Sequence, residues 1–172
     1  DTLTDAFNRR AFAEFAAIEW ARSVRLACPL SILAVDIDHF KTFNDRHGHL
    51  TGDRALVQVS KSAQAALRAN DIWCRYGGEE FVALLPNTNA TQAQAIAERL
   101  RQTVESTAIT GSDASGPLTV TISVGAAERL ASHTGVAEVL ALADAALYKA
   151  KAAGRNQVII HTPTASESGV LM

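Results

Sequence analysis

The stretch RYGGEEF, residues 75–81, lies between two apolar segments, residues 72–74 and residues 81–85. Two consecutive glycines between strand-like segments predict a β-hairpin. Glycine tolerates φ > 0 and leaves room for another group to approach the backbone, so we expect the tip to admit a ligand. Two glutamates follow directly, and neighbouring like charges repel each other. A divalent cation would relieve this repulsion; a solvated acidic turn is the alternative.

The composition indicates one soluble globular domain. The chain has 172 residues, 48% of them apolar and 20% charged. Its net charge of −2 gives no bias toward nucleic acid or an anionic membrane, so we expect neither as a partner. No apolar run approaches the roughly 20 residues of a membrane helix, and we expect a cytoplasmic domain, which includes the cytoplasmic part of a membrane-anchored protein. The chain begins without methionine, so we expect an upstream sensor or dimerisation region.

Helical and strand patterns alternate along the chain, but one pair of strands forms a hairpin. This mixture predicts an α+β domain over residues 1–160, with helices around a mostly antiparallel sheet; a doubly wound parallel sheet is the alternative. We expect a loop over residues 111–117 and a disordered tail over residues 161–172. The expected helices cover residues 9–26, 40–46, 52–69, 90–107 and 136–152, and the expected strands cover residues 30–38, 72–74, 81–85, 118–125 and 157–160.

Two aspartates end the first long apolar strand. Asp38 is well placed to cap the next helix, which leaves Asp36 as the better candidate for a metal ligand. If this strand neighbours the hairpin, Asp36 and Glu79 converge. Two carboxylates from different strands form a hard oxygen site suited to Mg²⁺, which keeps positions for water and phosphate oxygens. A helix cap plus a surface acid is the alternative.

Basic residues and helix ends suggest where phosphates would bind. The turn over residues 37–41 presents backbone amides at a helix N-terminus, and Lys41 in that first turn makes sense facing an anion. Lys151 and Arg155 are four residues apart at the end of the last helix, on one side if the helix persists. Favourable interaction with the helix dipole is the alternative explanation for this pair.

A nucleotide base needs hydrogen-bond partners. Asn44 and Asp53 flank the sequence HGH, residues 47–49, so both can point into one cleft, and His49 is a further candidate there. Guanine presents two adjacent donors that a carboxylate such as Asp53 accepts, whereas adenine lacks them; Asn44 both donates and accepts. A helix-start aspartate and a surface asparagine are the alternatives.

Together these residues resemble the diguanylate cyclases, or GGDEF domains. Residues 77–81 match the signature in its GGEEF form. The other matching segments are DIDHFK (36–41) with ND (44–45), HGH (47–49) and GD (52–53), then ALYKAK (146–151) with GRN (154–156), and DTLT (1–4) with NRR (8–10). The resemblance covers residues 1–160. One departure is that Asp5 stands where the family usually has a glycine.

The resemblance implies a palm-like α+β fold related to nucleotide cyclases and polymerases. It also implies condensation of two GTP molecules to cyclic di-GMP and pyrophosphate, with Mg²⁺ or alternatively Mn²⁺. Because one chain offers one GTP site, it implies a two-fold homodimer. A catalytically silent module that binds GTP or cyclic di-GMP is the runner-up, and a cyclase or transferase that uses ATP is a third reading.

Roles follow from the resemblance residue by residue. Asp36, the Ile37 carbonyl and Glu79 would bind the metal, and Glu80 fills the second acidic position of the signature, after Gly77 and Gly78. Asn44 and Asp53 would read guanine. The residues expected to hold phosphates are the backbone near Phe40, with Lys41, Lys151 and Arg155.

A second ligand site is implied just before the hairpin. Arg68 and Asp71 match the family's RxxD inhibitory site, at which cyclic di-GMP restrains its own synthesis. Arginine suits bidentate contacts with phosphate and with guanine. Arg99 on the following helix is a candidate second contact. An ordinary charged helix end is the alternative.

Overall fold

The computed structural model describes residues 1–109 and 116–163. In that part of the chain, six strands form one sheet in the order β1-β3-β4-β2-β5-β6. β2 is antiparallel to both neighbours, and the parallel pairs lie at the two edges. The strands are β1 (Phe7–Asn8), β2 (Leu30–Ile37), β3 (Ile72–Arg75), β4 (Glu80–Pro86), β5 (Ile122–Glu128) and β6 (Val158–Ile160). The predicted α+β fold with a mostly antiparallel sheet is confirmed, and the doubly wound alternative is wrong.

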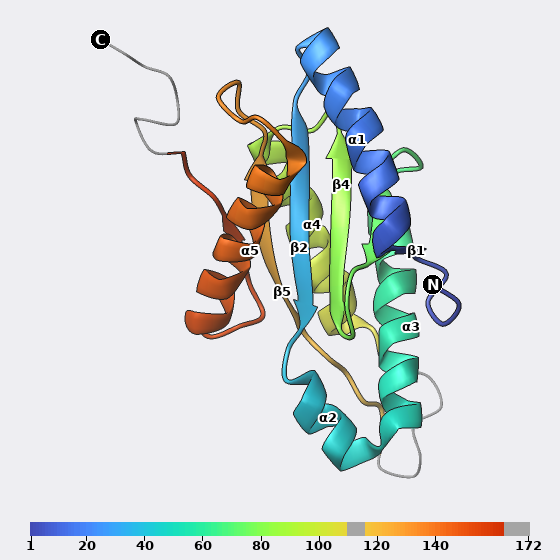
Figure 1. Ribbon diagram of the computed structural model, residues 1–172. Coiled ribbons are helices and arrows are strands. Elements are labelled where there is room, and N and C mark those ends of the chain that lie inside the picture. Colours follow the sequence, from blue (N-terminus) through green and yellow to red (C-terminus); the bar gives the residue numbers. More distant parts are fainter. Residues whose placement is uncertain (110–115, 164–172) are drawn as a thin grey trace.

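Five helices surround the sheet in the described residues. They are α1 (Arg9–Leu26), α2 (Phe40–His47), α3 (His49–Ala66), α4 (Ala90–Ser106) and α5 (Val136–Ala152). α1 and α5 cover one face of the sheet, and α3 and α4 cover the other (Figure 1). α2 lies beyond the end of β2, next to the hairpin that joins β3 to β4 (Figure 1). This end of the sheet therefore gathers the acidic tip and the start of α2.

Alternating residues of β2 pack into two separate hydrophobic cores, one on each face of the sheet. Leu33 and Val35 pack with α3 and α4, whereas Ile32 and Ala34 pack with α1 and α5. Side chains of a strand point alternately to opposite faces, so a strand covered on both sides is apolar almost throughout. All residues of β2 are buried, including its last acid, Asp36.

α5 lies unusually close to β5 at one position. A Cβ atom added to Gly125 would lie 2.1 Å from the carbonyl oxygen of Ala143 and 2.1 Å from the amide nitrogen of Leu147. Any larger residue at Gly125 would push the helix away from the sheet. Gly125 therefore sets the distance between α5 and the sheet. Helix α5 carries Lys151 at its C-terminal end.

The predicted boundaries differ from the structure in a few places. β1 was not predicted, because two residues paired with β3 leave no periodic pattern. β5 begins at Ile122 instead of residue 118, and Leu118 makes only an isolated bridge with Ile109. α3 begins at His49 because the break before it is confined to Gly48, whose φ is +81°.

The predicted loop and tail fall largely outside the described residues. Of the loop, only residues 116–117 are described, and of the tail, only residues 161–163. The amide of His161 still donates to the carbonyl of Ala126 at 2.7 Å, so the first residue of the expected tail continues the pairing of β6 with β5.

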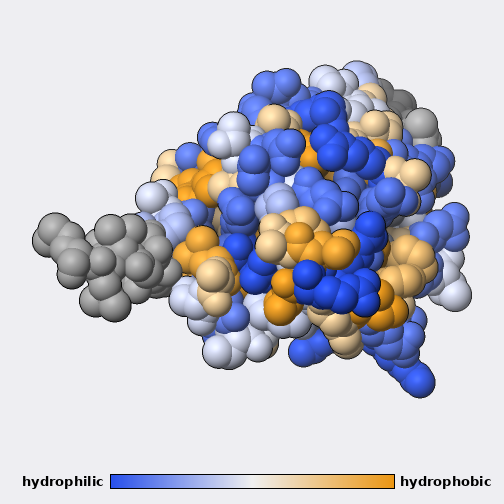
Figure 2. All heavy atoms as spheres, turned by 90° about the horizontal axis from the view of Figure 1, so that it is seen from above, coloured by the Kyte–Doolittle hydropathy of each residue, from blue (hydrophilic) through white to orange (hydrophobic). Residues whose placement is uncertain are grey.

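The surface carries scattered apolar side chains. Figure 2 views the end of the molecule away from α2, where small apolar groups lie among hydrophilic ones. Val24 and Leu26, in the last turn of α1, are exposed. Among the described helices, none has the length and apolar character that a membrane span requires.

Candidate active site

The predicted hairpin is present, and backbone hydrogen bonds close its tip. The amides of Tyr76 and Gly77 donate to the carbonyl of Glu80 at 2.8 and 3.1 Å. The Arg75 guanidinium donates twice to the carbonyl of Gly78, at 2.8 and 3.1 Å. Arg75 was not predicted as a site residue, although it opens the signature stretch. It holds the tip in a fixed shape.

The two glycines of the tip have different surroundings. Neither Gly77 nor Gly78 has a positive φ, so the tolerance of glycine for positive φ is not used at the tip. A Cβ atom on Gly77 would lie 2.6 Å from a carboxylate oxygen of Glu80, whereas one on Gly78 would meet nothing within 4 Å. Gly77 makes room for the Glu80 side chain, and Gly78 leaves the tip open.

Strand pairing brings the three predicted acids together. β2 lies between β4 and β5, and Asp36 is directly opposite Glu80 in the β2–β4 register. The Ile37 amide donates to the Glu79 carbonyl at 3.4 Å. The condition set from the sequence, that the first strand neighbours the hairpin, is therefore met.

The electrostatics of this acidic tip are unfavourable for the folded chain alone. Burial is the main cause that raises the pKa of Asp36, and Glu80 and Asp38 add to it. Burial and the charge of Asp36 raise the pKa of Glu79. Lys151 offsets part of this, because its Nζ lies 2.8 Å from an Asp36 carboxylate oxygen. One lysine thus faces an excess of carboxylate charge.

Asp38 does not cap α2. The N-cap residue is His39, in the left-handed region with φ +55°, and no side chain caps the helix. The buried carboxylate of Asp38 instead accepts hydrogen bonds from the hydroxyls of Thr121 (2.8 Å) and Ser123 (2.6 Å) and from the Asn156 amide (3.0 Å). Sequence could not reveal this, because the partners follow more than 80 residues later. Asp38 ties the end of β2 to β5 and to the turn after α5.

A single pocket joins the tip to the predicted base-reading residues. Its volume is about 500 Å³. The predicted residues that line it are Phe40, Lys41, Asn44, His49, Asp53, Gly78 and Glu79, with Asp45, Leu56 and Arg75 in addition. Hydrogen-bonding groups suited to a base and a carboxylate suited to a metal therefore share one cavity of nucleotide-scale size.

Asn44 is held in this pocket by contact with Gly52. A Cβ atom on Gly52 would lie 1.7 Å from the Asn44 side-chain oxygen, so only glycine admits this side chain. That oxygen is buried and has no hydrogen-bond partner in the described residues. Buried polar atoms without a partner are uncommon and invite a ligand or water.

The backbone amides and basic side chains predicted to bind phosphates are only partly arranged as expected. In the turn before α2, the amides of Ile37 and Asp38 already donate to Glu79 and Thr121, so only the amides from residue 39 onward lie at the helix start. Lys41 is exposed and lines the pocket. Helix α5 ends at Ala152, and Arg155 has φ +65°. The idea that Lys151 and Arg155 share a helical side is therefore wrong.

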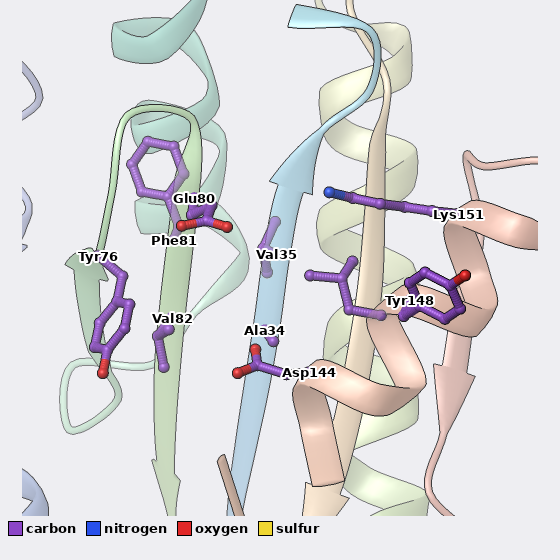
Figure 3. Close-up of a pocket in the computed structure, with 10 residues that line it drawn as sticks. Ala34, Val35, Tyr76, Glu80, Phe81, Val82, Asp144, Tyr148 and Lys151 are labelled. Atoms are coloured by element: carbon purple, nitrogen blue, oxygen red, sulfur yellow. The ribbon is translucent and has the colours of Figure 1, made fainter. Parts of the chain in front are cut away.

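A smaller pocket of about 250 Å³ lies on the α5 side of the same strands. Figure 3 shows Glu80 at the hairpin tip, Lys151 reaching from α5 toward β2, and Asp144 and Tyr148 on α5. Glu80 and Lys151 thus connect the acidic tip with a second opening. Asp144 and Tyr148 were not predicted, because single polar residues on an amphipathic helix give no signal beyond exposure.

The RxxD segment is a compact turn at the start of β3, away from the tip. The amide of Arg68 donates to the Asp71 carboxylate at 2.8 Å, and the Asp71 amide donates to the Arg68 carbonyl at 3.0 Å. The Arg99 guanidinium donates to the carbonyl of Ala66, at the end of α3. Burial raises the pKa of Asp71, and the charges of Arg68 and Arg99 counteract it. The three predicted residues therefore lie close together.

The donors at the acidic tip are of the kind that bind a divalent metal ion. Asp36, Glu79 and the backbone carbonyl of Ile37 are hard oxygen donors, and the raised pKa values of both carboxyls indicate charge that a cation would stabilise. The described residues contain no group of three or more side chains able to hold a metal by themselves. The remaining positions would fall to water and phosphate oxygens, as is usual for Mg²⁺.

Comparisons with known proteins agree with this geometry. Residues 1–157 match the family described as "Diguanylate cyclase, GGDEF domain". The probable diguanylate cyclase DgcT of Escherichia coli is 38% identical over 160 residues, which are 93% of this chain and 35% of that protein. The chain thus spans about a third of the length of such curated relatives.

Solved structures resemble the fold over nearly the whole chain. The GGDEF domain of DgcB from Caulobacter crescentus, in complex with c-di-GMP, has a TM-score of 0.88 and 34% identity, covering 94% of each chain. The active GGEEF domain of a diguanylate cyclase from Vibrio cholerae has a TM-score of 0.84 and 33% identity, covering 92% of this chain and 99% of its own. With the acidic hairpin and its pocket, these matches establish that the chain belongs to the GGDEF family of diguanylate cyclase domains.

Proposed function

We propose that this domain is a diguanylate cyclase that condenses two GTP molecules to cyclic di-GMP and two pyrophosphates, with Mg²⁺. One observation carries the proposal: Glu79 of the acidic tip lines the same pocket as Asn44 and Asp53. The family and the solved relatives support the reaction class.

The pocket supports guanine as the base. The Asp53 carboxylate accepts from the two adjacent donors of guanine, and Asn44 reaches its remaining polar edge. Gly52 keeps the Asn44 side chain in place. Adenine offers no such pair of donors, so ATP leaves the Asp53 carboxylate unmatched, which disfavours ATP.

The phosphates lie, in this proposal, between the start of α2 and the acidic tip. The first amides of a helix have no acceptor within the helix, and the positive end of its dipole favours an anion. Lys41 faces this region from the pocket wall. Lys151 is released from Asp36 to a phosphate oxygen when a cation takes over the charge of that carboxylate. Arg155 supplies a further guanidinium.

The metal site serves the phosphoryl transfer. When bound, Mg²⁺ lowers the pKa of the attacking 3′-hydroxyl and neutralises charge on the phosphates. The groups that would hold it are the carboxylates of Asp36 and Glu79 and the backbone carbonyl of Ile37. The 3′-oxygen of one GTP bonds to the α-phosphorus of the other, the bond from that phosphorus to pyrophosphate breaks, and a carboxylate of the tip, Glu79 or Glu80, takes the proton.

Two chains are needed for the product. The base-reading residues of one chain share a pocket with its own tip, and this pocket has room for one guanine, whereas cyclic di-GMP has two. A two-fold arrangement with tips face to face gives each 3′-hydroxyl access to the other chain's α-phosphate. An upstream sensor region would bring the two domains together.

The turn with Arg68, Asp71 and Arg99 is proposed to bind the product and to restrain turnover. Its arginines suit the phosphates and guanine edges of cyclic di-GMP. Arg68→Ala is expected to weaken inhibition by added cyclic di-GMP while the initial rate with GTP stays the same. An unchanged inhibition curve rejects this site.

A silent module that only binds GTP or cyclic di-GMP is the alternative. The complete set of acids at the tip opposes it. The test is incubation of concentrated protein with Mg²⁺ and GTP or ATP, followed by chromatography and mass measurement of the products. We expect cyclic di-GMP from GTP alone, and none with Glu79→Ala. Tight GTP binding without turnover, even when two domains are joined by a fused dimerising segment, selects the silent module.

A further inference from the structure

Three residues in a row have positive φ just after α5. The values are +118° for Gly154, +65° for Arg155 and +46° for Asn156. Left-handed backbone is disfavoured for side chains other than glycine, and asparagine tolerates it better than arginine. Such a conformation persists only where surrounding contacts determine it.

The contacts that determine it converge on Asn156. Its amide donates to Asp38 at 3.0 Å, and its side-chain nitrogen donates to Glu105 at 2.7 Å. Its side-chain oxygen accepts from the guanidinium of Arg101 at 2.8 Å. The amide of Arg155 itself donates to the carbonyl of Ala150 at 3.0 Å. Three of these bonds involve a charged partner, and such bonds are stronger than neutral ones.

The partners of Asn156 are fixed in turn. The Arg101 guanidinium bonds Glu98 at 2.8–3.1 Å and Glu105 at 2.7 Å, and its side chain is only 12% exposed. Asp38 is buried and held by the hydroxyls of β5 and the segment before it. The turn after α5 is therefore clamped between α4 and the end of β2.

We propose that Asn156 is a positioning residue, which keeps Arg155 aimed at the phosphates of bound GTP through its bonds to Arg101, Glu105 and Asp38. The inference rests on the proposed function, because it needs Arg155 to meet a phosphate. Asp38 follows the proposed metal ligand Asp36 by two residues. The Asp38 carboxylate therefore fixes the end of β2, which carries Asp36, relative to the turn that carries Arg155. The backbone of Arg155 is fixed before the nucleotide arrives, so less conformational freedom remains to be lost on binding.

The test is a double-mutant cycle on nucleotide affinity. Calorimetry measures the Kd of a GTP analogue with a methylene bridge between the α and β phosphorus atoms, for the parent, Asn156→Ala, Arg155→Ala and the double variant. Loss of a charged phosphate contact is expected to weaken binding about tenfold in Arg155→Ala. Asn156→Ala is expected to weaken it about threefold to tenfold alone, and not at all when Arg155 is already absent.

Guanosine, which has the base but no phosphate, is the matched control ligand, and competition should show the same affinity in all four proteins. Gln102→Ala, on α4 but without contact to Asn156, is the matched control variant. If Asn156→Ala does not fold, Glu105→Ala takes its place, because it removes only the acceptor for the Asn156 side chain and one partner of Arg101.

Equal losses from Asn156→Ala with and without Arg155 overturn the inference and leave the proposed function intact. An unchanged affinity in Arg155→Ala overturns it together with the phosphate role of Arg155. A loss for guanosine as well as the analogue also overturns it, because the substitution then disturbs the pocket as a whole.

Discussion

Two dense clusters of charge differ in how they affect their carboxyl groups: the pKa values are raised in one cluster and lowered in the other. At the acidic tip, Asp36, Glu79 and Glu80 face Lys151, and burial and mutual repulsion raise the pKa of Asp36 and Glu79. On α4, Arg101 lies between two glutamates. Its hydrogen bonds are the main cause that lowers the pKa of Glu98, and the hydrogen bonds of Asn156 and then of Arg101 lower the pKa of Glu105. At the tip three carboxylates have one lysine between them, whereas on α4 each of the two carboxylates bonds directly to Arg101.

The difference follows from how each cluster is built. On α4 the charges are three and four residues apart on one helix face, a spacing that brings opposite charges together. At the tip, strand register places an acid opposite an acid. Folding alone gains nothing from that arrangement, so we infer that the tip is arranged for a cation and substrate that arrive later.

The largest expected effect comes from removing an acid at the tip. Glu79→Ala should lower the rate of cyclic di-GMP formation about a hundredfold or more, because it removes a ligand of the proposed metal. Glu98→Gln on α4 should leave the rate at saturating GTP within about twofold, since it lies outside the pocket and is linked to bound GTP only through Arg101 and Asn156. Steady-state rates with GTP at saturating Mg²⁺ check both, and similar losses would break the contrast.

The next effect concerns the pocket that adjoins the tip. Asp53→Ala should reduce the preference for GTP over ATP about tenfold to a hundredfold, because the carboxylate no longer accepts from the guanine donors. Competition between the two nucleotides for binding measures it. If the preference survives intact, guanine is read elsewhere.

A smaller effect is expected from removing the positive charge of Lys151 at the acidic tip. Lys151→Met keeps most of the side-chain volume but leaves Asp36 without its partner at 2.8 Å. The free energy of unfolding without metal should fall by about 1 kcal/mol. Mg²⁺ should restore part of it. Denaturant melts with and without Mg²⁺ test this, and a variant as stable as the parent would contradict the pairing.

The smallest expected effect is a change in the free energy of unfolding with pH, and it has opposite signs in the two clusters. Raised pKa of Glu79 means that the folded state binds its proton more tightly than the unfolded chain, so its ionisation destabilises the fold as pH rises through that range. Lowered pKa of Glu98 means that its ionised form contributes stability above the ordinary glutamate range, which is lost as pH falls.

In metal-free protein at pH 7, Glu79→Gln should therefore raise the free energy of unfolding, and Glu98→Gln should lower it. Each change is expected to be about 0.5 kcal/mol, because both side chains are partly solvated. At a pH below the lowered pKa of folded Glu98, where both glutamates are protonated in the folded and unfolded states, both differences should vanish. Changes of the same sign in the two variants would contradict the contrast.

The local sequence pattern was sufficient to predict the acidic tip, but it was insufficient to predict the contacts of Asn156 that hold the turn after α5. The glycine pair, the buried strand that carries Asp36, and the residues around Gly48 lie in continuous segments, so each segment could be predicted. Their convergence depended on the strand order, which places β2 beside β4. The bonds of Asp38 and Asn156 join segments 118 residues apart, and neither residue type signals such a partner. The left-handed Arg155 was unpredictable for the same reason, since tertiary contacts override local preference there.

The claim that the acidic tip binds a divalent cation is tested most directly by thermal melting with Mg²⁺ and the methylene-bridged GTP analogue. The parent should gain several degrees from Mg²⁺ in the presence of the analogue, because binding to the folded state stabilises it. Glu79→Gln, which keeps the side-chain shape, should gain almost nothing from Mg²⁺. An equal gain in both proteins, or none in the parent, would contradict the metal site at the hairpin tip.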